Sequence, residues 1–267
     1  MAIIRYLAML SHTPDSLAKF YTTYMGMDEL GRSAAGDISL TDGAYNLTLF
    51  KHRADLNEPN METGFHHLGI AVDSLAETEA RYREFYPHGT VVRESGDLQH
   101  GEMRIYDPEC HPVTLSERNF HLGPNTAKVP RIAHIAMGAL DPGAVYDFYA
   151  NVFGFPEMLV AHAAAAKRPG YRNRHVGDGF TNVAIQAYYN DREGHEARHG
   201  IAHIGFVVED AMALADSARG VATLARRPDS RVQSEVRMRD PEGNGYDLSR
   251  RGWEVGLEAW ARVEARA

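Results

Sequence analysis

Two short apolar runs, RIAHIA at residues 131–136 and GIAHIG at residues 200–205, each carry a histidine at the same point. A third stretch, DPEGNGYDL at residues 240–248, places a carboxylate shortly after a turn. Side chains alternate between the two faces of a strand, so each of these groups has a defined face. Two imidazoles and one carboxylate that come from strands are the donor set of a mononuclear divalent metal site with open positions. The residues concerned are His134, His203 and Asp247.

The composition is that of a soluble globular protein. The chain has 267 residues, 44% of them hydrophobic and 24% charged, with a net charge of −8 and a sequence pI near 5.9. It lacks the basic stripe of a nucleic-acid-binding protein and any apolar run of the roughly 20 residues that cross a bilayer, so we expect neither partner. The single cysteine, Cys110, fits a cytoplasmic protein without disulfides.

The chain repeats itself four times. Phe20 and Phe148 lie in matching segments 128 residues apart (148 − 20), and His67 and His203 lie in matching runs 136 residues apart (203 − 67). The Asp-Pro pair at residue 107 matches the pair at residue 240, at an offset of 133. Self-similarity of this kind indicates a repeated structural unit. The four units start near Ile3, Phe65, Arg131 and Ile201.

Each unit is predicted to fold as strand–helix–strand–strand–strand, because an apolar run is followed by a helical pattern and then by short alternating runs. Residues 15–24 and 142–153 are expected to be helices that end at Gly26 and Gly154. The predicted class is therefore α+β. Residues 1–122 and 130–252 are expected to form two domains, and residues 253–267 a terminal amphipathic helix.

With these motifs, the whole chain resembles the vicinal oxygen chelate superfamily, which includes glyoxalases, bleomycin-resistance proteins and extradiol ring-cleaving dioxygenases. The resemblance implies paired βαβββ modules that curl into two open, barrel-like sheets. It also implies that metal ligands come from the first strand of each module and from the last strand. The last-strand ligand belongs to a sequence motif similar to residues 240–248. The family usually has glutamate where this chain has Asp247. Aspartate is shorter but is still a hard oxygen donor.

Only the C-terminal half carries the full donor set. The equivalent positions of the N-terminal half are Tyr6, His67 and Thr114, and one imidazole without a carboxylate does not hold a divalent ion tightly. We therefore expect the metal at His134, His203 and Asp247, with Fe(II) favoured and Mn, Zn or Ni as alternatives. This asymmetry between the halves resembles that of extradiol dioxygenases.

The sequence departs from ring-cleaving dioxygenases at two positions. Thr181 stands where those enzymes carry a histidine, and Arg237 stands where they carry a tyrosine, so their usual proton shuttle is not reproduced. His175 and Tyr171, in an insertion at residues 161–178, are the candidate catalytic substitutes, against the alternative of a solvated loop. Gln186, a possible fourth ligand, is expected to face away from the site.

Three functions fit these residues. The first is an extradiol-dioxygenase-like oxygenase that acts on a catechol-like or vicinally oxygenated small molecule. The second is a glyoxalase-type lyase or isomerase that uses the ion as a Lewis acid, and the third is a binding protein that sequesters a small aromatic molecule. Oxygen consumption, activity with zinc or nickel, and ligand binding that survives chelation distinguish the three. A homo-oligomer is compatible with the sequence, which does not decide the oligomeric state.

Overall fold

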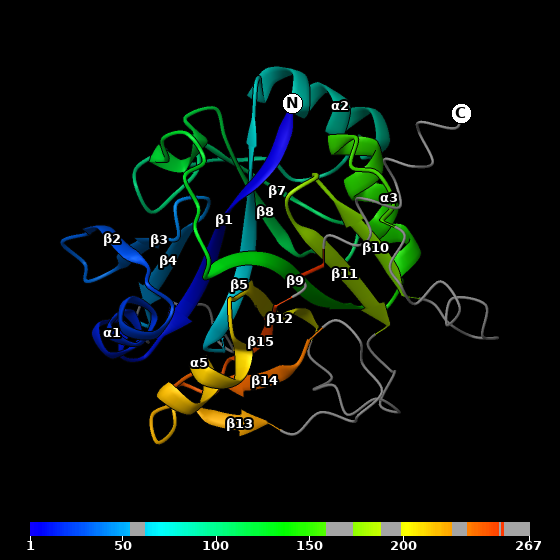
Figure 1. The fold of residues 1–267 in the computed structure, drawn as a ribbon. Helices are drawn as coiled ribbons and strands as arrows, with labels where there is room; N and C mark the ends of the chain where they lie inside the picture. The colour runs from blue at the N-terminus through cyan, green and yellow to red at the C-terminus, as the bar shows by residue number, and fades with distance from the viewer. Residues whose placement is uncertain (54–61, 159–172, 188–198, 226–233, 251, 254–267) are drawn as a thin grey trace.

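The computed structural model describes residues 1–53, 62–158, 173–187, 199–225, 234–250 and 252–253 (Figure 1). The elements of the N-terminal half are β1 (Ala2–Ser11), α1 (Pro14–Tyr24), β2 (Asp28–Arg32), β3 (Ile38–Thr41), β4 (Asn46–Lys51), β5 (Gly64–Val72), α2 (Leu75–Phe85), β6 (Val92–Arg93), β7 (Met103–Tyr106), β8 (Pro112–Ser116) and a short 3-10 helix, η1 (Asn119–His121). Those of the C-terminal half are β9 (Arg131–Ala139), α3 (Pro142–Phe153), β10 (Arg174–Gly177), β11 (Asn182–Ala187), β12 (Gly200–Val207), α5 (Ala211–Ser217), β13 (Thr223–Ala225), β14 (Val236–Arg239) and β15 (Gly245–Ser249).

Each half builds one open sheet. The first has the strand order β2-β3-β4-β1-β5-β8-β7-β6, and the second has the order β10-β11-β9-β12-β15-β14-β13. In the middle of each sheet the first strands of two units pair antiparallel, β1 with β5 and β9 with β12. The last strand of each unit lies parallel to its first strand, as β15 does beside β12. The predicted α+β class with paired modules is confirmed, and neither sheet closes into a barrel.

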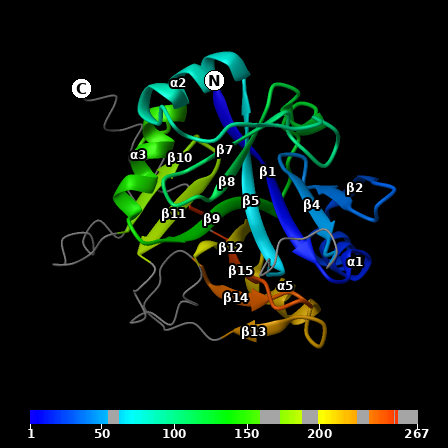
Figure 2. The same cartoon turned by 180° about the vertical axis from the view of Figure 1, so that it is seen from behind.

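The helix predicted in the third unit begins and ends as expected. The side chain of Asp141 accepts hydrogen bonds from the backbone amides of Gly143 and Ala144, 3.0 and 3.2 Å away, and so caps the first turn of α3. Gly154 ends the helix in the left-handed conformation, with φ of 72°, which glycine adopts without strain. α2 and α3 pack against each other, although they belong to different halves (Figures 1 and 2).

The two halves contact each other through matching residues. Asp42, in a turn of the first half, accepts a hydrogen bond of 2.7 Å from the backbone amide of Ile132 on β9. Asp178, its counterpart in the second half, accepts one of 2.7 Å from the amide of Ile4 on β1. Two glutamates also accept hydrogen bonds from the other half. Glu109 accepts from the backbone amide of Leu140 before α3, and Glu242 accepts from the backbone amide of Thr13 before α1. The repeat is therefore visible in the tertiary contacts as well as in the sequence.

The predicted order of strand, helix and three strands is found in the first, second and fourth units, whereas the described residues of the third unit show two strands after α3. Residues 174–177, which we expected in an insertion, form β10 and pair with β11 at the edge of the second sheet. β2 and β13 also extend the sheets beyond the runs that alternation indicated. The predicted terminal helix falls outside the described residues, except for Trp253. No described helix combines the length and the apolar character needed to cross a bilayer.

Candidate functional site

Five residues lie side by side across the centre of the second sheet and form what we call the site row. The site row consists of Asn182 on β11, His134 on β9, Gly205 on β12, Asp247 on β15 and Arg237 on β14. His203 lies two positions before Gly205 and so projects from the same face of β12. Because neighbouring strands are about 4.8 Å apart, His134 and Asp247 reach toward each other across a glycine.

The three predicted metal ligands are buried on one face of the second sheet, but among the described residues their ligand atoms are not all within 4.8 Å of one another. The Nε2 atom of His203 lies 3.5 Å from the Oδ2 atom of Asp247, and the rings of His134 and His203 are 5.6 Å apart between centroids. All three side chains are at most 5% exposed. Three buried donors from three different strands therefore lie near one another, and their role as metal ligands stays a prediction.

The imidazole of His134 is oriented by Asn182. Its Nδ1 atom lies 2.9 Å from the side-chain oxygen of Asn182, which can only accept a hydrogen bond from it. The proton of a neutral His134 is therefore on Nδ1, and the lone pair is on Nε2. Histidines that bind metals are commonly held in this way, with the second nitrogen bonded to an oxygen. Asn182 was not among the residues that we singled out in the sequence.

Arg237 lies directly against two of the three donors. Its Nε and Nη2 atoms donate to the two carboxylate oxygens of Asp247 at 2.7 and 3.1 Å, a bidentate pair. Its Nη2 atom also lies 2.9 Å from Nε2 of His203. A guanidinium can only donate, so this nitrogen of His203 carries a lone pair. The arginine thus places a positive charge beside the donors that a divalent ion would use.

The electrostatics of the site favour neutral imidazoles and an ionised carboxylate. Burial, assisted by the neighbouring His203, holds the pKa of His134 well below its ordinary value. Burial alone would raise the pKa of Asp247, but the interactions with His203 and Arg237 hold it well below its ordinary value. Among the interactions that lower the pKa of Asp247, those with His203 come first and those with Arg237 second. These protonation states are the ones that metal ligands require.

Trp253 covers the site. Its ring stacks on His134 with the centroids 4.6 Å apart and the planes within 5° of parallel. Gly205 makes room for it, because a Cβ atom at this position would lie only 2.4 Å from the tryptophan ring and 2.9 Å from the Cβ of His134. Trp253 is 4% exposed, so the aromatic ring excludes water from one side of His134.

The first sheet has an equivalent row with different chemistry. Its residues, in the same order as the site row, are Asn46, Tyr6, Gly69, Thr114 and Arg104. Phe120 stacks on Tyr6 at 4.8 Å and touches the position of Gly69, as Trp253 does on His134 and Gly205. Arginine and the aromatic cover are therefore common to both halves, whereas the histidine and the aspartate of the row occur only in the second. In place of a carboxylate within the row, Arg104 pairs with Glu94 from the edge of its sheet.

Of the two candidate catalytic residues, His175 lies on the face of the site. It pairs with Ala184, which pairs with Ala136 beside His203, so His175 lies in the same row as His203, three strands away. Its charge contributes to the lowered pKa of His134 after burial and His203. Tyr171 falls outside the described residues.

Two expectations for β11 are corrected by its register. Asn182 faces His134, so Thr181 faces the other way, where its hydroxyl bonds to that of Tyr45 from the first half. Thr181 therefore lies in the contact between the halves and faces away from His134. Gln186 shares the face of Asn182, so the expectation that it points away from the site is wrong. The error arose because we took Thr181 as the residue that faces the site.

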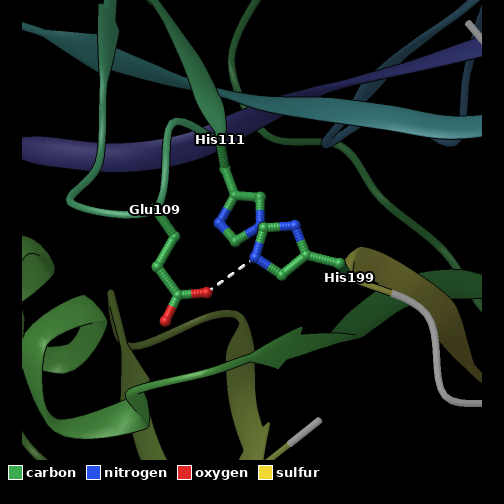
Figure 3. Close-up of side chains that lie close together, drawn as sticks. All are labelled: Glu109, His111 and His199. Atoms are coloured by element: carbon green, nitrogen blue, oxygen red, sulfur yellow. Dashed lines mark hydrogen bonds and ion pairs between the residues drawn. The ribbon is translucent and has the colours of Figure 1, made fainter. Parts of the chain in front are cut away.

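A second group of donors lies at the junction of the two halves and was not predicted. Glu109, His111 and His199 are the three residues whose ligand atoms lie within 4.8 Å of one another among the described histidines, cysteines and carboxylates (Figure 3). Glu109 and His111 come from the turn between β7 and β8, and His199 directly precedes β12. The sequence around His199 is charged. The histidine is exposed, but it faces His111 from the other half, a contact that no local pattern indicates.

The Glyoxalase/Bleomycin resistance protein/Dioxygenase superfamily matches residues 3–114 and 131–248, which are the two halves described above. The chain belongs to this family. No curated protein matches the sequence significantly. The two matched segments each span a pair of modules, as the internal repeat requires, so membership in the superfamily applies to both sheets.

Several solved structures of the superfamily share the fold. The 2,3-dioxygenase LapB from Pseudomonas sp. KL28 is 15% identical with a TM-score of 0.66, covering 92% of this chain and 91% of its own. Homoprotocatechuate 2,3-dioxygenase from Arthrobacter globiformis is 15% identical with a TM-score of 0.65, covering 92% and 79%. The Mn(II)-bound glyoxalase from Novosphingobium aromaticivorans is 17% identical with a TM-score of 0.64, covering 92% and 81%. At these identities the likeness extends to the fold alone.

Proposed function

We propose that the protein is a metal-dependent enzyme that binds a small molecule through two neighbouring oxygens, with His134, His203 and Asp247 as the metal ligands. The observation that carries the proposal is that these three buried donors lie on one face of β9, β12 and β15, with His203 3.5 Å from Asp247. Binding one ion requires His134 to move toward the other two, because the three ligand atoms are not all within 4.8 Å of one another. The finer proposal is an oxygenase of the extradiol type, acting on a catechol-like substrate. The superfamily supports it because its solved members include ring-cleaving dioxygenases and a Mn(II)-bound glyoxalase.

The residues fit a divalent ion in their chemistry. Nε2 of His134 and Nε2 of His203 both carry lone pairs, and Asp247 is ionised. Two neutral imidazoles and one carboxylate leave about three of six coordination positions open. When bound, an ion such as Fe(II) supplies a Lewis acid with room for two substrate oxygens and dioxygen. The protein residues around it hold the ligands in place and exclude water: Asn182 orients His134, and Trp253 covers it.

Arg237 changes its partners in this proposal. The lone pair of His203 Nε2 is bonded to the guanidinium, and it cannot serve a metal ion at the same time. Loading therefore requires the guanidinium to leave His203, after which it can bind an anionic oxygen of the substrate. His175, on the same face, is the proposed group that exchanges a proton with the substrate, since Thr181 is turned away.

We predict that Arg237→Met binds Fe(II) or Mn(II) more tightly than the natural protein. The change removes a competing donor from His203, and a hydrogen bond to a charged group is worth about 1.5–3 kcal/mol, so the affinity should rise roughly tenfold or more. Anaerobic metal titration followed by calorimetry measures it. Arg104→Met, the equivalent change in the first sheet, is the matched control and should leave the affinity unchanged. Weaker binding in Arg237→Met would argue that the arginine supports the ligands and does not compete with the ion.

Activity is tested with anaerobically iron-loaded protein, a panel of catechols and dissolved oxygen. Oxygen uptake together with yellow ring-fission products is the expected result, and His203→Ala should abolish both. Activity that needs zinc or nickel and no oxygen would instead favour a glyoxalase-type lyase or isomerase. No turnover with any of these ions, across the whole panel, would contradict the enzymatic proposal.

A binding function is the second candidate, because Arg237 and Trp253 already fill the space beside the donors. A buried guanidinium paired with a carboxylate can hold an anionic oxygen of an aromatic ligand without a metal. Tight ligand binding that is retained after chelation and in His203→Ala would favour this function over the enzyme.

A further inference from the structure

A chain of hydrogen bonds joins the two halves at the second group of donors, whose three side chains Figure 3 shows. Nδ1 of His111 lies 2.7 Å from Oδ2 of Asp107, and Nε2 of His199 lies 2.7 Å from Oε2 of Glu109. The remaining nitrogens, Nε2 of His111 and Nδ1 of His199, face each other at 3.3 Å. Each imidazole is therefore bonded to a carboxylate on one side and to the other imidazole on the opposite side.

The facing nitrogens need a cation between them. An ionised carboxylate accepts the proton of the imidazole nitrogen that it contacts. Asp107 then fixes the proton of His111 on Nδ1, and Glu109 fixes the proton of His199 on Nε2. Two neutral imidazoles in these tautomers turn lone pairs toward each other, which is repulsive. Either an additional proton or a metal ion removes the repulsion.

The spacing of the two nitrogens is that of two ligands on one tetrahedral ion. Zinc binds imidazole nitrogen at about 2.0–2.1 Å with tetrahedral angles, so two such nitrogens lie roughly 3.3–3.4 Å apart. The facing nitrogens are 3.3 Å apart. The carboxylate of Glu109 lies 2.7 Å from Nε2 of His199 and is anchored by the backbone amides of Leu140 and Asp141, so it orients His199. Asp107 in turn orients His111, as carboxylates do beside metal-binding histidines.

We propose that His111 Nε2 and His199 Nδ1 bind a zinc ion that clamps the N-terminal half of the protein to the C-terminal half, with Asp107 and Glu109 holding the two imidazoles from their other nitrogens. The ligands come from the turn between β7 and β8 and from the start of β12, so the ion ties together segments 88 residues apart in the sequence. His199 is 40% exposed at its side chain, which gives the ion access from solvent. This site is separate from the donors of the proposed enzyme and has a structural role.

The internal repeat provides a control within the same chain. By the offsets of 133 and 136, the counterparts of Glu109, His111 and His199 are Glu242, Asn244 and Thr63. Asn244 donates to both oxygens of Asp240 at 3.1 and 2.9 Å, as His111 bonds to Asp107. The same junction is thus built a second time with neither histidine. Histidine is therefore not required for the turn to fold, and the substitutions that remove the proposed ligands are known in advance to fit.

The test uses the full chain, freed of metal by chelation, titrated with zinc chloride at pH 7.5 and followed by calorimetry and by the Tm. We expect a zinc site in the natural protein and in His203→Ala, and its loss in His111→Asn/His199→Thr. At a hundredfold excess over Kd, zinc should raise the Tm by roughly 5–10 °C only where the site is intact. Glu109→Gln should weaken binding at least tenfold.

The outcomes separate this proposal from the proposed function. His203→Ala removes a ligand of the proposed enzyme site and leaves His111 and His199 unchanged. Zinc binding by this variant therefore reports on the clamp alone. Zinc binding of equal stoichiometry and affinity in His111→Asn/His199→Thr, or no zinc binding in His203→Ala, would overturn the proposal. The single change His199→Thr, at an exposed side chain, serves if the double variant folds poorly. The unchanged Tm of metal-free variants checks that folding is preserved.

Discussion

Replacing Asp247 with alanine should lower the free energy of unfolding by about 3–5 kcal/mol and abolish metal binding at the enzyme site, because removing one partner of a buried ion pair leaves the other charge uncompensated. Asp247 is 1% exposed at its side chain, and Arg237, its bidentate partner, is 15% exposed. Urea denaturation followed by circular dichroism measures the stability, and metal analysis after anaerobic loading measures the binding.

A double substitution distinguishes the two roles of Asp247. In Arg237→Met/Asp247→Leu both charges are gone and the space is filled with apolar groups, so most of the lost stability should return. Metal binding should not return, because the carboxylate ligand is absent. Recovery of metal binding in the double variant would show that Asp247 is not a ligand. Full stability of Asp247→Ala would show that the ion pair with Arg237 contributes little to the fold.

The change Gly205→Ala should displace Trp253 from His134. The new Cβ would lie 2.4 Å from the tryptophan ring, closer than any stable contact, so the ring must move. Overpacking of this kind costs about 1–3 kcal/mol. We expect a red shift of the tryptophan fluorescence as the ring becomes exposed to water, together with loss of metal binding or activity as His134 loses its position.

Gly69→Ala is the matched control for this change. Its Cβ would lie 2.6 Å from Phe120 and 2.8 Å from Tyr6, so its steric cost in the first sheet should be similar. It should lower stability without affecting the metal or activity of the second sheet. If both variants lost function equally, the effect of Gly205→Ala would reflect general destabilisation and not the geometry of the site row.

Gly205 and Gly69 belong to two equivalent rows of residues, and most of this equivalence could be predicted from the sequence. The repeat offsets placed Tyr6 opposite His134 and Thr114 opposite Asp247, and the structure has these pairs at equivalent positions of two sheets. The same offset of 133 relates Phe120 to Trp253 and Arg104 to Arg237. The signal for these residues was therefore present, but nothing local indicates that an aromatic ring beyond the last strand folds back over the site.

The orientation of β11 shows where sequence reasoning failed. Alternation states that Thr181 and Asn182 face opposite sides, but it does not state which side is which. The choice depends on the pairing of β11 with β9, which places Asn182 beside His134. A shift of one residue exchanges every side chain between the faces. This is why the expectations for Thr181 and Gln186 were wrong together.

The repeat, the succession of strand and helix within each unit and the placement of His134, His203 and Asp247 on strands were determined by the sequence alone, because they follow from local periodicity and from spacing along the chain. Only the tertiary structure decided that Arg237 lies against His203 and Asp247, that Trp253 covers His134, and that His199 meets His111 across the junction of the halves. These contacts join segments that are distant in the chain. They depend on how the sheets are paired and packed, and a one-dimensional pattern does not contain that information.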